Sequence, residues 1–159
     1  MSPQHAAQLA SLVRGRQAAA LGTLHDGAPS VSMVPYALLP DASAFIVHVS
    51  ALAAHTKDMR ADARVSLLVM QPEGEGTQAQ ALARVSIHGE ARELPKGSPE
   101  AAAASQAYLA RFPEAAPLTG FGDFAFFAIR ARQARFVAGF AQALSLQGAT
   151  LEKVLASAA

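Results

Sequence analysis

The chain has 159 residues, 52% of them hydrophobic and 16% charged, with a formal net charge of +1. This length favours a single domain, residues 1–159, with a core of its own. A net charge near zero gives no reason to expect a nucleic acid or an anionic membrane as partner. The absence of cysteine excludes disulfides and thiolate-bound metals, and no apolar run approaches the roughly 20 residues of a membrane helix. We therefore expect a soluble, cytoplasmic protein.

The first quarter of the chain predicts a helix and a β-hairpin. Residues 1–17 carry apolar side chains at helical spacing from position 3 onward. Two short apolar strands follow, Ala18–Leu24 and Pro29–Leu38, joined by Asp26-Gly27, a pair typical of tight hairpin turns. Pro35 cannot donate a hydrogen bond to a neighbouring strand, so the second strand is expected at a sheet edge or at a bulge.

The stretch Phe45–Met70 is the strongest candidate for a ligand-binding corner. Its two ends, Phe45–Val49 and Val65–Met70, are apolar and β-branched enough for buried strands, and a short helix lies between them. Hydroxyls, an ammonium group and free backbone N–H groups at a helix start suit a phosphate. The segment between the strands offers such donors in Ser50, His55, Thr56 and Lys57.

Two residues of this stretch have an equally simple structural interpretation. Lys57 can belong to a solvated helix face and pair with Asp58 or Asp62. His48 lies between two valines in an apolar strand, a position more typical of a core or interface histidine than of a metal ligand. No two histidines have the i,i+4 or HxH spacing of a metal site, so we expect no bound metal.

Residues 71–94 predict an exposed loop followed by an alternating strand. Gln71–Gln80 contains proline and glycine and has little to bury. In Ala81–Leu94 one face is apolar and the other is polar, as in a strand with one face in a core. The polar face carries Arg84, Ser86, His88 and Glu90. That face is solvent, a dimer contact or the wall of a polar pocket.

The last third predicts a helix, two strands and a short terminal helix. Ser98-Pro99-Glu100 has the order of cap, proline and acid that opens helices, and this helix is expected to reach Ala110. The remaining elements are a loop over residues 112–123, two strands over 124–129 and 136–140 joined near Arg132-Gln133, and a C-terminal tail over 144–159 with a helix at 150–156.

Together these elements favour a mainly β, α+β fold. About six to seven strands and three or four scattered helices suit a closed or nearly closed antiparallel barrel better than regular β-α-β repeats. The chain has no Walker phosphate loop, no nucleophile elbow and no dinucleotide glycine fingerprint. Its acids form no pair suited to hydrolysis, and no residue stands out as catalytic.

Three patterns, in order along the chain, resemble the flavin mononucleotide (FMN)-binding split barrels related to pyridoxamine 5′-phosphate oxidase. They are SALAAHTKDMRADARVSLLV at Ser50–Val69, RVSIHGEA at Arg84–Ala91 and GFGDFAFFAIRARQARFVAGFAQA at Gly120–Ala143. The third is most similar to the branch that contains haem-utilisation proteins. The resemblance covers residues 12–146 and implies a six-stranded antiparallel split β-barrel with peripheral helices.

The resemblance also implies a homodimer that holds FMN between its two protomers. Lys57 matches the phosphate-binding lysine of the family, and Arg84 matches a polar residue that reaches the flavin. Phe140 falls near an aromatic position contributed by the partner subunit. The other implied contacts are His55 and Thr56 in the phosphate shell, His48, Val49 and Ser50 near the ribityl phosphate, and Ser32, Met33 and Val34 on the strand whose backbone meets the flavin ring.

Three functions remain open from the sequence. The first is an FMN-dependent oxidoreductase acting on a small-molecule substrate, and the second is a haem-binding or haem-utilisation protein without flavin turnover. The third is a dimerisation barrel without a cofactor. Residues 142–159 contain neither the arginine–histidine motif of pyridoxamine-phosphate oxidases nor the histidine with which haem-degrading relatives ligate iron. This argues against vitamin B6 oxidation and against haem turnover of that kind.

Overall fold

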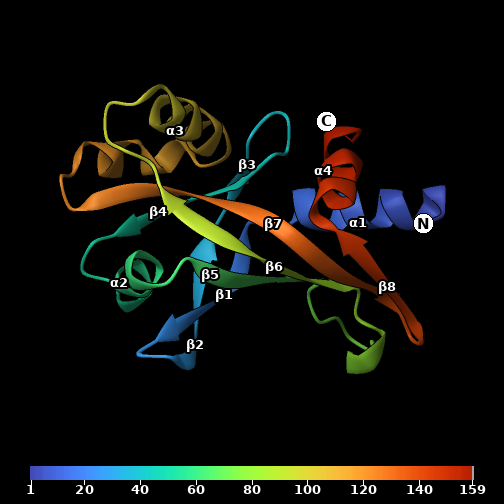
Figure 1. Cartoon of the computed structure of the whole chain (residues 1–159). Helices are drawn as coiled ribbons and strands as arrows, with labels where there is room; N and C mark the ends of the chain where they lie inside the picture. Colours follow the sequence, from blue (N-terminus) through green and yellow to red (C-terminus); the bar gives the residue numbers. More distant parts are fainter. Residues whose placement is uncertain (159) are drawn as a thin grey trace.

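The computed structural model describes residues 1–158. Its elements, in chain order, are α1 (Pro3–Gly15), β1 (Ala18–His25), β2 (Ala28–Pro35), β3 (Ala37–Leu38), β4 (Phe45–Ser50), α2 (Ala54–Ala61), β5 (Arg64–Met70), the 3₁₀ turn η1 (Ala79–Ala81), β6 (Arg84–Glu93), α3 (Pro99–Arg111), the 3₁₀ segment η2 (Pro113–Gly120), β7 (Phe124–Gly139), β8 (Gln142–Gln147) and α4 (Gly148–Ala156). The strands of these residues form one antiparallel sheet that curls into a half-barrel (Figure 1). The expected mainly β, α+β architecture with peripheral helices is confirmed.

The sheet is organised around the long strand β7. The strand order is β2-β1-β5-β6-β7-β4-β3, and β8 pairs with β7 outside this path. On one side β7 pairs with β6 over most of its length. On the other side its first half pairs with β4 and its second half with β8. Because β7 has partners along both edges, it holds the two ends of the half-barrel together.

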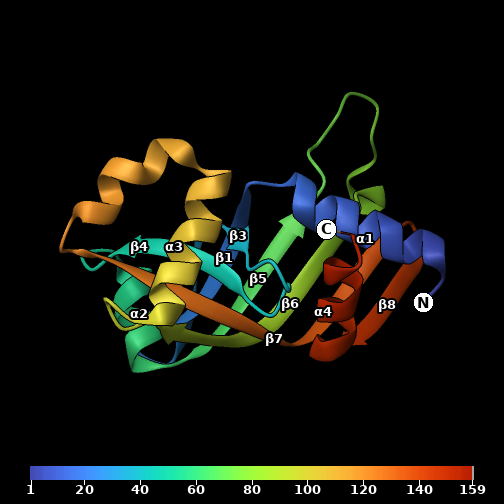
Figure 2. The ribbon, with the colours of Figure 1, turned by 90° about the horizontal axis from the view of Figure 1, so that it is seen from above.

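The concave side of the sheet encloses the main core. Leu21, Leu67, Val85 and Phe136 are fully buried there, as expected for the apolar positions of alternating strands. The helices α1 and α4 lie side by side at one end of the sheet and close it (Figure 2). Their contribution to this core includes Leu9, Val13, Leu151 and Leu155.

A second, smaller core lies under α3, on the opposite side of β4 and β7 (Figure 2). It contains Ile46 of β4, Ala128 of β7 and Tyr108 of α3. Successive residues of a strand point to opposite faces, so β4 serves both cores. Phe45, Val47 and Val49 face the half-barrel, whereas Ile46 and His48 face α3.

The predicted hairpin is confirmed in detail. Asp26 and Gly27 have φ angles of 50° and 80°, the left-handed values that an Asp-Gly hairpin turn requires. Pro35 ends β2, which pairs only with β1 and so forms one edge of the sheet. The expected edge position of Pro35 is therefore confirmed. The helices predicted near both ends of the chain are present as α1 and α4.

The prediction of two strands at 124–129 and 136–140 is wrong, because β7 runs without interruption from Phe124 to Gly139. The intervening Arg130, Arg132 and Gln133 are exposed, and Arg130 and Gln133 still pair with β6 on either side of a bulge at Arg132. In the sequence, these exposed polar side chains resemble those of a turn, although the pairing between β6 and β7 continues on both sides of them. Strand β8 is not predicted from the sequence, since the alternation of apolar and polar residues in QALSLQ is weak. The sheet thus has eight strands, not six or seven.

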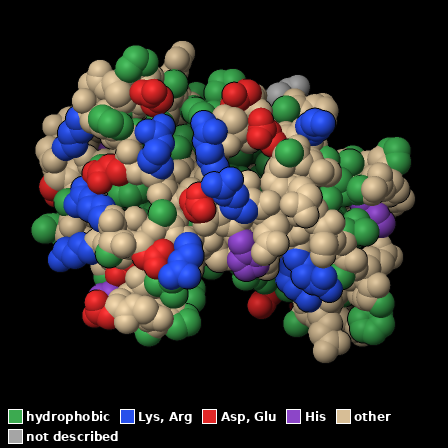
Figure 3. Space-filling view, viewed as in Figure 1, with side chains coloured by type: hydrophobic (Ala, Val, Ile, Leu, Met, Phe, Trp, Pro, Cys, Tyr) green, Lys and Arg blue, Asp and Glu red, His purple; other side chains and the backbone are tan. Residues whose placement is uncertain are grey.

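The predicted loop at 112–123 contains the 3₁₀ segment η2. No helix within residues 1–158 is both long and apolar enough to cross a membrane. Figure 3 shows basic and acidic side chains interspersed over one face. Three ion pairs join Arg60 to Glu93, Arg64 to Asp62 and Arg132 to Glu90.

Candidate functional site

The predicted corner forms where β4 ends and α2 begins. Helix α2 buries Thr56, Asp58 and Met59 against the open end of the half-barrel. Asp58 accepts hydrogen bonds from the Thr23 hydroxyl at 2.9 Å and from His25 Nδ1 at 2.7 Å, both on β1. The hydrogen bond from His25 holds the pKa of Asp58 below its usual value, and Asp58 in turn raises the pKa of His25. This polar cluster fixes α2 against the end of β1.

Two of the predicted cofactor residues meet at this corner. Ser32 Oγ of β2 lies 3.1 Å from His55 Nδ1 of α2. Burial lowers the pKa of His55, so its ring is neutral and Nε2 is left for another partner. Lys57 is exposed and forms no ion pair within residues 1–158. The pairing of Lys57 with Asp58 or Asp62 is therefore not observed, because these carboxylates pair with His25 and Arg64.

The two hydroxyl groups of the corner are already engaged. Thr56 is fully buried, and its hydroxyl donates to the Ser50 carbonyl at 2.6 Å. Ser50 Oγ accepts from the backbone N–H of Leu52 at 3.2 Å. These bonds close the turn between β4 and α2. The Thr56 hydroxyl therefore already has a partner in this structure, and among the predicted donors Lys57 alone is exposed and without a hydrogen bond within residues 1–158.

A second feature lies directly beside this corner, between α3 and the ends of β4 and β7. It is a cavity of about 390 Å³ whose walls differ in character. One wall is aromatic, and the other is built from small residues of α3 and of the segment before β7. The aromatic wall carries His48, Phe121, Phe124 and Phe126, and the small residues are Gly97, Ala101, Ala102, Gly120 and Gly122. We call it the aromatic pocket.

His48 occupies the centre of the aromatic wall. Its ring centroid lies 4.3 Å from that of Phe126 and 5.0 Å from that of Phe124. The imidazole is half-buried and has no hydrogen-bond partner within residues 1–158. Burial, and then the charge of Lys96, lower the pKa of His48. A neutral imidazole with unused nitrogen atoms thus faces an apolar cavity.

Lys96 lies at the rim of the aromatic pocket, where its Nζ donates to the Gly122 carbonyl. Lys96, Phe121 and Tyr108 were missed from the sequence as site residues. Tyr108 contacts His48, Phe121 contacts Phe124, and Lys96 contacts Gly122, so most of these contacts join parts of the chain that are far apart, and no local pattern indicates them. The pocket and the corner are linked by one backbone bond, from Ala51 N–H to the Asp123 carbonyl at 2.6 Å.

The other predicted residues lie elsewhere. Arg84 is at the end of β6 that pairs with Met70, away from α2, and donates to the Leu82 carbonyl at 2.9 Å. Phe140 is at the tip of the β7–β8 hairpin and is 68% exposed. Within one protomer, neither residue joins the corner. Any contribution to the same ligand requires a second copy of the chain.

The two faces of strand β2 differ in their exposure to solvent. Val34 is buried in the main core, whereas Met33 and Val31 are 64% and 76% exposed on the outer face of the sheet. Val49 is likewise buried in the main core and can offer only its backbone to a ligand. The exposed apolar side chains on an edge strand mark the outer face as a candidate contact surface.

This half-barrel, with a helix start and an aromatic pocket at the end of β4, defines a protein of the split-barrel class. The family model described as pyridoxamine 5′-phosphate oxidase matches residues 6–138. The chain therefore belongs to the pyridoxamine 5′-phosphate oxidase family.

Similar proteins carry names that refer to haem. HOZ, a chloroplastic heme oxygenase of Arabidopsis thaliana, is 39% identical over 119 residues, which is 75% of this chain and 35% of that protein. The chain thus spans about a third of this curated relative. The structure of a heme binding protein from Mycobacterium smegmatis superimposes with a TM-score of 0.83 and 27% identity over 99% of this chain and 62% of that one. HutZ of Vibrio cholerae, a heme storage protein, shares the fold at 21% identity, with a TM-score of 0.71 over 81% of this chain and 89% of that one.

Proposed function

We propose that this chain is a haem-binding protein and that the aromatic pocket holds the tetrapyrrole. The observation that carries the proposal is the neutral, unpaired imidazole of His48 in a wall of phenylalanine rings. The names of the relative from Arabidopsis and of the mycobacterial structure support the same ligand class.

The donor set of the pocket fits haem. Imidazole nitrogen is a common ligand of haem iron, and it binds only in the deprotonated form that the low pKa of His48 favours. The phenylalanine rings suit the flat apolar macrocycle, and Lys96 is positioned at the rim for a carboxylate of the ligand. Bound haem would supply the iron chemistry, while the protein provides the ligand and the apolar walls.

The size of the pocket suggests that one protomer does not enclose the ligand. A cavity of about 390 Å³ is at the lower end of the range of ligand pockets, about 300–1,000 Å³. A tetrapyrrole extends beyond the rim, where Phe121 is 54% exposed, and Leu52 in the turn after β4 is 78% exposed. We propose that a second copy of the chain covers these side chains, and that the outer face at Val31 and Met33 takes part in a homodimer.

Titration of the purified protein with haemin tests this function. We expect a saturable Soret band at one haem per chain, and size-exclusion chromatography is expected to show a dimer. His48→Ala should weaken haem binding by at least about tenfold, since it removes the iron ligand. His5→Ala is the matched control, because His5 is on α1 and contacts Gln142. Equal affinity of the His48 and His5 variants would contradict the role of the pocket.

A second candidate function is FMN binding by a flavin-dependent oxidoreductase with a small-molecule substrate. One observation favours it, namely that Lys57 at the start of α2 is exposed and has no acidic partner within residues 1–158, while Ser32 and His55 meet beside it. A lysine at a helix start suits the phosphate of FMN. Lys57→Ala should lower FMN affinity by about tenfold, whereas Lys153→Ala on α4 should not. A protein that retains haem but no FMN after gel filtration would exclude this candidate.

A further inference from the structure

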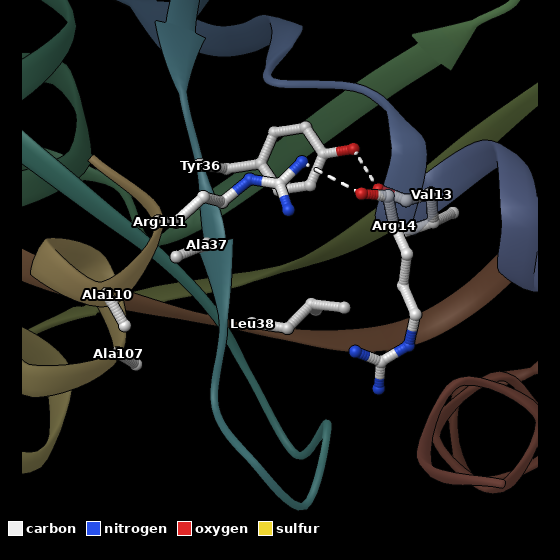
Figure 4. A pocket seen from close by; sticks show the side chains of 8 residues that line it. All are labelled: Val13, Arg14, Tyr36, Ala37, Leu38, Ala107, Ala110 and Arg111. Atoms are coloured by element: carbon white, nitrogen blue, oxygen red, sulfur yellow. Dashed lines mark hydrogen bonds between the residues drawn. The ribbon is translucent and has the colours of Figure 1, made fainter. Parts of the chain in front are cut away.

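A second cavity lies on the other side of α3, between that helix, β3 and the C-terminal end of α1 (Figure 4). Its volume is about 270 Å³, too small for haem or FMN. The lining includes Tyr36 and Leu38 from the sheet side, Ala107 from α3, and two arginines from different helices, Arg14 and Arg111. None of these residues belongs to the corner or to the aromatic pocket.

The arginines around this cavity lack acidic partners. Arg14, Arg16 and Arg111 form no ion pair within residues 1–158. The Nε atoms of Arg111 and of Arg16, which follows α1 but does not line the cavity, are moreover buried and have no hydrogen-bond partner within residues 1–158. Native structures rarely leave buried donors unpaired, and an unpaired charge is especially costly. The site therefore carries positive charge that no acidic side chain within residues 1–158 balances, and an anionic ligand would offset it.

The simplest alternative is that these arginines only cap helix ends. Arg111 Nη2 donates to the carbonyls of Arg14, at 3.0 Å, and of Arg16, at the end of α1. Arg14 donates through Nε and Nη2 to the Leu155 carbonyl in the last turn of α4, at 3.1 and 2.7 Å. A helix C-terminus carries about half a negative charge, so two of them offset about one of three positive charges. Capping therefore leaves an excess of about two positive charges.

Tyr36 does not neutralise this excess. Its hydroxyl donates to the Val13 carbonyl at 2.6 Å, and burial raises its pKa to about 12 despite the nearby charges of Arg111 and Arg16. The phenol is therefore uncharged. Its ring instead supports the guanidinium of Arg111, whose central carbon lies 5.7 Å from the ring centre. The hydrogen bonds to helix ends hold Arg14 and Arg111 in place on either side of Leu38 (Figure 4).

We infer that this cavity binds the oxyanion group of a small metabolite, a carboxylate or a phosphate, between Arg14 and Arg111. The Nη1 groups of both arginines make no hydrogen bond within residues 1–158, and such charged N–H donors recognise both oxyanions. The apolar floor at Leu38 and Ala107 accommodates a short aliphatic part and excludes large ring systems. This site is separate from the haem-binding pocket, and its ligand is expected to bind whether or not haem is present.

Calorimetric titration of the haem-free full chain, in chloride buffer of constant ionic strength, tests the site. The two probes are inorganic phosphate and butyrate, and the preferred one distinguishes a phosphate from a carboxylate ligand. We expect saturable binding of at least one probe and a rise in the midpoint of thermal unfolding that follows its occupancy. Absence of saturable binding of both probes up to about 50 mM would overturn the proposal.

Variants separate this site from adventitious anion binding. Arg14→Gln keeps the cap of α1 intact and should weaken binding of the preferred probe by about tenfold. Arg111→Lys retains the charge but not the paired donors and should weaken it as well. Arg92→Gln on the exposed face of β6 is the matched control and should bind as the unaltered chain does. Equal binding by all four proteins would mean adventitious ions only, and would also overturn the proposal.

Discussion

The imidazole of His48 stacks on the ring of Phe126, with ring centroids 4.3 Å apart and an angle of 29° between the planes. The two residues are direct neighbours across the β4–β7 ladder. The stacking fixes the ring and keeps water from one of its faces, and this burial is the main cause of the low pKa of His48. The same contact that packs the strand thus favours the neutral imidazole that the proposed binding of haem iron requires.

The first prediction concerns the pH dependence of haem binding. Iron binds the neutral form of histidine, and the pKa of His48 lies below its usual value of 6.5. Between about pH 8 and about pH 5, haem affinity should therefore begin to fall at a lower pH than it would with an exposed histidine as the ligand. Soret titrations across this range provide the measurement. A fall in affinity that starts near pH 7 would show that a different, exposed histidine binds the iron.

The second prediction concerns Gly89, at the bulge where β6 shifts its register against β7. A Cβ atom at this position would lie 2.2 Å from the Arg130 carbonyl oxygen. Gly89→Ala should therefore lower the free energy of unfolding by about 1–3 kcal/mol or more, as overpacking does. Urea denaturation measures this change. Gly15→Ala, where the added methyl group meets no atom within 4 Å, is the control and should not destabilise the chain.

The third prediction concerns the buried hydroxyl of Thr56. Thr56→Val keeps the shape of the side chain but leaves the Ser50 carbonyl without its donor, so the free energy of unfolding should fall by about 1–3 kcal/mol. Thr150→Val on the exposed start of α4 should change it by less than about 0.5 kcal/mol. If both variants unfold at the same urea concentration, the hydroxyl does not hold the β4–α2 turn.

The fourth prediction concerns the His25–Asp58 pair. The pKa of His25 is raised, so its stabilising contribution is complete below pH 6.5 and is lost as the pH rises through its folded-state value. The pKa of Asp58 is lowered, so its contribution is present above pH 3.8 and is lost as the pH falls through its folded-state value. The pair therefore stabilises the fold most between these two limits.

His25→Gln isolates this effect. His48 and His55 have lowered pKa values and act in the opposite direction, so the relevant quantity is the difference in unfolding free energy between the two proteins. That difference should shrink as the pH rises from about 6 to about 9. A difference that stays constant over this range would show that the imidazolium of His25 contributes nothing.

The sequence predicts local structure well and long-range contacts poorly. The Asp26-Gly27 hairpin and the strand–helix–strand stretch from Phe45 to Met70 depend on turn chemistry and alternation within a few residues, and both are observed. The uninterrupted strand β7 could not be predicted, because its exposed arginines have the pattern of a turn. Pairing with β6 and β8 keeps this segment extended. This is tertiary pairing overriding local pattern.

In the candidate site, too, local features could be predicted from the sequence and long-range contacts could not. The polar character of the α2 corner is visible in the sequence, and Ser32 and His55 do meet there. The engagement of the Thr56 hydroxyl by Ser50 could not be predicted, since it depends on how the turn closes. Neither could the aromatic pocket, because His48 meets Lys96 and Phe121 only after β4, α3 and β7 have packed together. A histidine between two valines gives no sign of a cavity.

The most direct test of the central claim is to replace the proposed iron ligand and then restore it. His48→Gly should lose the Soret spectrum of the unaltered chain on addition of haemin, since the imidazole is gone. Adding free imidazole should restore that spectrum, because the small ligand can occupy the space that the side chain leaves. A parallel His88→Gly variant should need no imidazole. If instead His48→Gly binds haem with an unchanged spectrum, the iron is bound elsewhere and the aromatic pocket is not the haem site.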